Sequence, residues 1–129
     1  MPPRPVVLDT NFLLIPFRFK INIFSELDYL IEVSHRYVIS SKTLEELRRL
    51  SRSVGKHGMA ARLALKMIKA GKPKIEIIKN EMDVDEWIVG YAPKSDAIVC
   101  TNDSELRRRL KQFHIKVVAM KSKSKLGFV

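Results

Sequence analysis

The sequence predicts an α/β fold, with three α/β/α layers around a central parallel sheet of about five strands. Short runs of β-branched and aliphatic residues alternate with stretches whose apolar residues recur at helical spacing, from one end of the chain to the other. Such alternation is typical of βαβ units, whose connecting helices cover both faces of a parallel sheet. The 129 residues contain no internal repeat and are enough for one domain with a core of its own.

Five short apolar runs are the predicted strands. The first has three apolar β-formers that lead straight into a carboxylate, Asp9, which is the pattern of a buried parallel strand with a polar residue at its C-terminal end. Open α/β sheets bind their ligands at that end of the strands. In chain order the runs are residues 5–8, 37–40, 75–78, 97–101 and 115–120.

Helices are predicted between these strands, after a first stretch in which Pro16 prevents a long helix. Asn22 is placed to cap the next helix, and Ser40, Ser41 and Thr43 announce the one after it. The helix over residues 60–69 has the clearest apolar period in the chain. Its expected buried face consists of Ala60, Leu63, Ala64, Met67 and Ile68, and that of the last helix consists of Leu106, Leu110 and Phe113.

The helix that begins near Asp83 carries three local signals. Asp83 and Glu86 have the spacing of a capping box, and Met82 and Trp87 occupy the positions of a hydrophobic staple. Gly90 lies inside the helix at a cost of ~1 kcal/mol relative to alanine, which suggests close packing at that point.

The composition indicates a basic protein of the cell interior. The 24 Lys and Arg residues against 14 Asp and Glu residues give a net charge of +10, which attracts polyanions such as nucleic acid or an anionic membrane surface. Cys100 is the only cysteine, so no intrachain disulfide forms, and its apolar neighbours indicate a small buried side chain. Without a signal-like or membrane-spanning stretch we expect a cytoplasmic protein with no membrane partner. Residues 1–120 are the expected domain, and residues 121–129 are an expected mobile basic tail.

Four carboxylates stand at equivalent places relative to the predicted strands. Asp9 and Asp103 follow the first and fourth strands, while Glu46 and Asp85 lie in the first turns of the helices after the second and third. In a parallel sheet all four reach the same edge, where unpaired carboxylates would raise one another's pKa. A divalent cation removes that conflict, and oxygen ligands suit Mg²⁺ or Mn²⁺.

Each of these acids also has a purely structural explanation. Glu46 follows Thr43 at capping-box spacing, Asp85 suits the N-terminus of a helix, and Asp103 is a candidate cap. Capping does not explain why four acids from separate segments converge. Histidine chemistry is not indicated, because His35, His57 and His114 show no metal-ligand spacing; we expect these three residues on the surface or in packing roles.

The chain resembles the PIN-domain nucleases in four short motifs that follow the family's order. The motifs are residues 7–11 (VLDTN), 44–50 (LEELRRL), Asp85 with Ile88 and Ala92, and residues 99–103 (VCTND) with Leu106. The resemblance implies a metal-dependent endoribonuclease that uses Mg²⁺ or Mn²⁺. It identifies Asp9, Glu46, Asp85 and Asp103 as the catalytic and metal-binding acids, with Asn11 and Thr101 in support. The spacing to Ile88 and Ala92 selects Asp85 over its neighbours Asp83 and Glu86.

The substrate implied by this resemblance is RNA. Residues 103–109 look most like the archaeal and eukaryotic branch that processes ribosomal RNA. A ribonuclease toxin with an antitoxin partner and a non-catalytic RNA-binding scaffold are the alternatives. A homodimer is compatible with the family, although the sequence marks no interface. The residues expected to contact RNA are Arg18, Lys20, Arg107, Arg108, Arg109 and Lys111, with burial of the aromatic side chains and solvation of the basic helix faces as the competing explanations.

Overall fold

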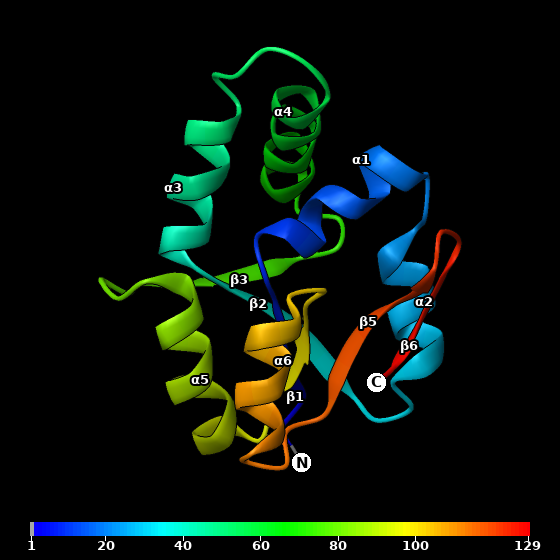
Figure 1. Ribbon diagram of the computed structural model, residues 1–129, viewed down its shortest axis with the longest axis vertical. Helices are drawn as coiled ribbons and strands as arrows, with labels where there is room; N and C mark the ends of the chain where they lie inside the picture. Colours follow the sequence, from blue (N-terminus) through cyan, green and yellow to red (C-terminus); the bar gives the residue numbers. More distant parts are fainter. Residues whose placement is uncertain (1) are drawn as a thin grey trace.

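The computed structural model describes residues 2–129 and contains one six-stranded sheet with the order β3-β2-β1-β4-β5-β6 (Figure 1). The first five strands along the chain pair in parallel, as predicted, and β6 pairs with β5 in the antiparallel direction. The strands are β1 (Arg4–Leu8), β2 (His35–Ser40), β3 (Ile75–Ile78), β4 (Ile98–Cys100), β5 (Val117–Ser122) and β6 (Lys125–Phe128). The predicted three-layer α/β/α class is confirmed.

Helices cover both faces of the sheet. They are the 3₁₀ helix η1 (Asn11–Leu14) and the α-helices α1 (Ile15–Phe19), α2 (Ile23–Leu30), α3 (Ser41–Leu50), α4 (Lys56–Ala70), α5 (Val84–Ser95) and α6 (Ser104–Lys111). Alternate residues of β1 point to opposite cores: Val6 and Leu8 pack with η1 and helices α1 to α4, whereas Val7 packs with α5 and α6. No helix in the described residues is both long and apolar enough to cross a bilayer.

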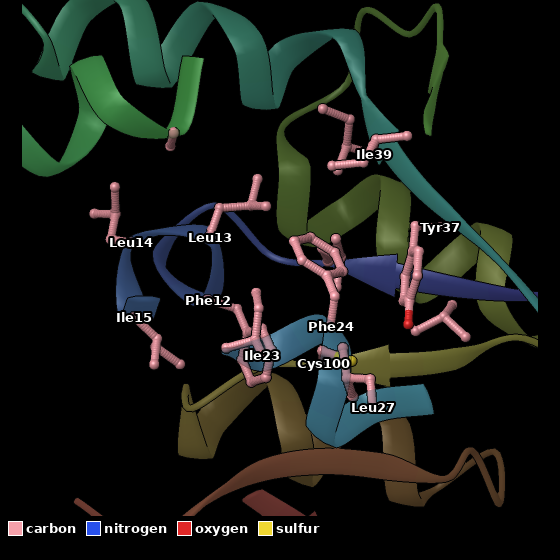
Figure 2. Packing of buried hydrophobic residues seen from close by; sticks show 14 of the residues in the cluster. Phe12, Leu13, Leu14, Ile15, Ile23, Phe24, Leu27, Tyr37, Ile39 and Cys100 are labelled. Atoms are coloured by element: carbon pink, nitrogen blue, oxygen red, sulfur yellow. The ribbon is translucent and has the colours of Figure 1, made fainter. Parts of the chain in front are cut away.

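The segment directly after β1 is anchored by its own apolar side chains. Phe12, Leu13 and Leu14 of η1 are fully buried and follow Asp9 within a few residues. Figure 2 shows Phe12 close to Ile23 in the core beneath the sheet edge. Because both sides of Asp9 are pinned by buried residues, the backbone that presents this carboxylate has little freedom.

The C-terminal segment differs from the expected mobile tail. Residues 121–128 complete β5 and form β6, and Leu126 and Gly127 are buried. The backbone N–H of Leu126 also donates to Glu26 Oε1 at 3.0 Å. The expectation of mobility was wrong because the lysines of this segment point to solvent at the edge of the sheet, where they are tolerated, while Leu126 joins the core.

Two of the predicted buried helix faces need correction. On α4 the side chain of Leu63 is 38% exposed and Ala61 is buried instead, so the helix packs through its smallest residues. Phe113 lies beyond the end of α6 and is 52% exposed, although Leu106 and Leu110 are buried as predicted. The prediction that Asn22 caps α2 is confirmed, since its side-chain oxygen accepts from Ser25 N–H at 3.1 Å.

The local signals at the start of α5 are not realised. Asp83 is the N-cap residue but makes no capping hydrogen bond through its side chain, and Glu86 binds Arg109 instead. Met82 is 52% exposed, so it forms no buried staple with Trp87. A Cβ added to Gly90 would meet no atom within 4 Å, so the expected close packing there is wrong.

Candidate active site

The four predicted acids line one cavity at the C-terminal edge of the sheet. Its volume is about 310 Å³, and its lining residues are Asp9, Thr10, Asn11, Glu46, Arg49, Leu50, Asp85 and Asp103. Figure 1 shows α3 leaving the sheet where β2 ends, with the N-terminal ends of α5 and α6 on the same side. Parallel pairing therefore brings together side chains that are far apart in the sequence.

Asp9 is the most buried of these acids, with 6% of its surface exposed. Its Oδ1 accepts from the Thr10 backbone N–H at 2.8 Å, and its Oδ2 accepts from the hydroxyl of Thr101 at 2.7 Å. Burial raises the pKa of Asp9 to about 6 against the lowering effect of these hydrogen bonds, and the nearby charges of Asp85 and Glu46 raise it further. The site thus holds a carboxylate that carries its charge at a cost.

Thr101 connects Asp9 to Asp103. Its buried hydroxyl donates to Asp9 and accepts from the backbone N–H of Asp103 at 3.0 Å. The resemblance assigned Thr101 and Asn11 to support of the acids. Thr101 contacts Asp9 directly, whereas Asn11 lines the cavity from the start of η1.

Glu46 is held by a residue that the sequence reasoning did not select. The hydroxyl of Thr10 donates to Glu46 Oε1, and it lies 3.4 Å from the hydroxyl of the buried Thr43. The alternative explanation of Glu46 as part of a capping box with Thr43 is wrong, because Ser40 caps α3 by accepting from Lys42 N–H. The signal for Thr10 was its position next to Asp9.

Asp103 combines the two roles considered for it. Its Oδ1 accepts from the backbone N–H groups of Glu105 and Leu106 at 2.9 and 3.2 Å, so it caps α6. It also lines the cavity and is one of the charges that raise the pKa of Asp85. Capping and a place in the cavity are therefore not exclusive.

Asp85 projects from the first turn of α5 into the same cavity. Burial raises its pKa, and the neighbouring charges of Asp103 and Glu46 add to that effect. The rival acids Asp83 and Glu86 line an adjoining cavity of about 450 Å³ but not this one.

The donor chemistry of the cavity fits a hard divalent cation. Four carboxylates supply oxygen ligands, and the raised pKa values of Asp9 and Asp85 show repulsion that a bound cation would relieve. Within residues 2–129, however, no three His, Cys, Asp or Glu side chains are placed tightly enough to hold one ion together. Small side-chain rotations would accompany binding. None of the three histidines lines the cavity.

The basic residues expected to bind RNA differ in their surroundings. Arg109 forms a two-pronged ion pair with Glu86, at 2.8 and 3.1 Å, and Arg108 pairs with Glu105. Arg107 and Lys111, on the same helix, have no ion-pair partner in the described residues. At the other expected contact, Arg18 lies over the ring of Phe19 at 5.4 Å, and Lys20 lines an apolar cavity next to α2. Their contact with RNA stays a prediction.

Arg49 is the lining residue that the sequence analysis missed. It lies one helical turn after Glu46 on α3, which places the two side chains on the same face. The LEELRRL motif contains it, but the motif by itself does not say which of its two arginines faces the acids.

Residues 6–123 match the family model of the PIN like domain, and the chain therefore belongs to the PIN-like domain family. The resemblance seen in its motifs is confirmed. The chain is 38% identical over 122 residues to ribonuclease VapC4 of Methanocaldococcus jannaschii, covering 92% of this chain and 91% of that protein. It is 33% identical over 119 residues to ribonuclease VapC9 of Archaeoglobus fulgidus, covering 92% and 84%.

Solved structures show the same fold. The PIN domain endonuclease Utp24 superposes with a TM-score of 0.79 and 25% identity, over 99% of this chain and 92% of that one. A domain of a functionally unknown protein from Methanocaldococcus jannaschii superposes with a TM-score of 0.64 and 17% identity, over 92% of both chains. The second likeness concerns the fold alone.

Proposed function

We propose that the protein is an endoribonuclease that depends on Mg²⁺ or Mn²⁺. The observation that carries the proposal is the cavity in which Asp9, Glu46, Asp85 and Asp103 meet at the C-terminal edge of the sheet. The relatives named as ribonucleases and the structural neighbour named as an endonuclease support cleavage of RNA within the chain. The net charge of +10 supports a polyanionic substrate.

In this proposal the residues of the chain hold the acids in place. Thr101 and the Thr10 N–H fix the Asp9 carboxylate from two sides, and the Thr10 hydroxyl fixes Glu46. Asp103 is fixed as the cap of α6, so its position follows that helix. A divalent cation held by these acids would supply Lewis acidity and positive charge toward a phosphodiester. The protein supplies the preorganised oxygen ligands that keep this charge at one point.

The direct test is cleavage of a labelled single-stranded RNA by the purified protein. We expect nicking with Mn²⁺ or Mg²⁺, none with a chelator, and a loss of at least about a hundredfold in Asp9→Asn, with RNA binding largely retained. Asp83→Asn is the matched control, because this acid lies on the same edge but outside the cavity. Equal cleavage by wild type and Asp9→Asn would refute the assignment.

The biological role that we propose is processing of ribosomal RNA, which rests on the resemblance of residues 103–109 to that branch of the family. A toxin with an antitoxin partner is the alternative, since it would share the size and the acids. The two differ in a cellular experiment: a toxin arrests growth on expression and is relieved by a neighbouring gene product. A processing enzyme would instead change precursor RNA on depletion. A non-catalytic scaffold is disfavoured because all four acids are present.

A further inference from the structure

The C-terminal end of α3 carries a cluster of arginines next to the acidic cavity. A shallow cavity of about 310 Å³ is lined there by Arg48, Arg49, Arg52 and Glu45. Three guanidinium groups thus face one carboxylate, and that carboxylate already pairs with Lys42 at 3.4 Å. Arg49 belongs to this cavity and to the acidic cavity, so the two are continuous through its side chain.

The other side of the acidic cavity has the opposite character. The adjoining cavity of about 450 Å³ shares Glu46, Asp85 and Arg49 with it. Its remaining acids are Glu45, Glu81, Asp83 and Glu86. Two of its three basic residues are neutralised, since Lys42 pairs with Glu45 and Glu81, and Arg109 pairs with Glu86. A phosphate chain is repelled on this side.

The arginines of α3 are free to bind an anion. Arg48, Arg49 and Arg52 are exposed, and none has an acidic partner within 4 Å in residues 2–129. The nearby Arg62 stiffens the turn after α3, because its guanidinium donates to the carbonyl oxygens of Ser51 and Ser53 at 2.7 and 3.3 Å. The turn that carries Arg52 is therefore held in position.

We propose that Arg48, Arg49 and Arg52 form the surface along which a single-stranded RNA backbone enters the acidic cavity, an inference that rests on the proposed function. Planar guanidinium groups suit phosphate oxygens in a two-pronged geometry. Arg49 spans both cavities and holds the phosphate next to the carboxylates, while Arg48 and Arg52 hold the chain outside them. The strand then avoids the acidic cavity beside α5.

The test compares two variants of equal net charge. Arg48→Gln/Arg49→Gln/Arg52→Gln removes the cluster, and Lys72→Gln/Lys74→Gln/Lys94→Gln removes three exposed lysines near the opposite edge of the sheet. Binding of a fluorescein-labelled uridine dodecamer is followed by anisotropy with Mg²⁺ in the Asp9→Asn background, from ~50 to ~200 mM salt. We expect the arginine variant to bind at least roughly tenfold more weakly, with a salt slope lower by about 2, and the lysine variant to change little.

Each result is informative. Equal losses in the two variants would mean that net charge alone attracts RNA, and no loss in the arginine variant would place the RNA elsewhere; either outcome overturns the inference. A third variant with lysine at all three positions should keep most of the salt slope, which separates lost charge from a disturbed helix. Cleavage by the wild-type protein is measured separately. If it cleaves and the anisotropy results coincide, only this inference fails; if it cleaves no RNA with any divalent cation, the proposed function fails instead.

Discussion

The stability of the metal-free protein should rise when the charge of Asp9 is removed. Asp9 is buried beside Asp85 and Glu46, and its pKa is raised from 3.8 to about 6. Because the pKa is higher in the folded chain than in the unfolded chain, the charged carboxylate opposes folding. The penalty is complete above about pH 6, shrinks as the pH falls, and is absent below about pH 3.8. Asp9→Asn removes it while keeping the shape of the side chain.

The magnitude follows from the same pKa. A difference of about two pH units corresponds to about 3 kcal/mol at pH 8. Asparagine can still accept from the Thr10 N–H, but it leaves the proton of the Thr101 hydroxyl without its acceptor, which costs about 1 kcal/mol. We therefore expect Asp9→Asn to be more stable than wild type by about 1–2 kcal/mol at pH 8 and slightly less stable near pH 4.

Urea unfolding followed by circular dichroism, with a chelator present, measures this difference at several pH values. Asp83→Asn is the control, since Asp83 is exposed and makes no capping hydrogen bond; its effect should stay within about 0.5 kcal/mol at every pH. Added Mg²⁺ should stabilise the wild-type protein and not Asp9→Asn. A destabilised Asp9→Asn at pH 8, or a difference that does not change with pH, would refute the electrostatic argument.

Two further predictions concern the neighbours of the acids. Thr101→Val removes a hydrogen bond that lowers the pKa of Asp9, so the acidic limb of the cleavage rate against pH should move upward by roughly one pH unit; an unmoved limb would contradict this. Arg107→Gln should weaken RNA binding more than Arg109→Gln does, because Glu86 already occupies two N–H groups of Arg109; titration of labelled RNA measures both. Equal losses would show that the ion pair opens on binding.

Most of the sheet could be predicted because its strands are buried on both faces. The runs that contain Val7, Val38 and Val99 are apolar throughout, and such runs have few alternatives in a βα chain. β6 could not be predicted, because its lysines read as a polar tail and its pairing depends on the antiparallel edge offered by β5. Local helix signals at Asp83 and Met82 failed for a similar reason, since contacts made across the fold outweigh a preference worth about 1 kcal/mol.

The acids could be predicted to converge, but their supports could not. The order of strands alone brings Asp9, Glu46 and Asp103 to one edge, whatever the details of packing. The bonds from Thr10 to Glu46 and from Thr101 to Asp9 depend instead on rotamers and on the distance between α3 and η1. Arg49 was missed because helix periodicity gives a face and not a neighbour.

The charge distribution links the fold to the proposed chemistry. A chain with a net charge of +10 nevertheless gathers four carboxylates into one cavity, where they raise the pKa of Asp9 and Asp85. Ion pairs with the available arginines would have relieved that repulsion, yet Arg108 and Arg109 pair with Glu105 and Glu86 outside the cavity. Folding therefore leaves the acids without counter-ions of their own. A site built in this way favours cations from solution, and the surrounding basic surface favours the polyanion on which they would act.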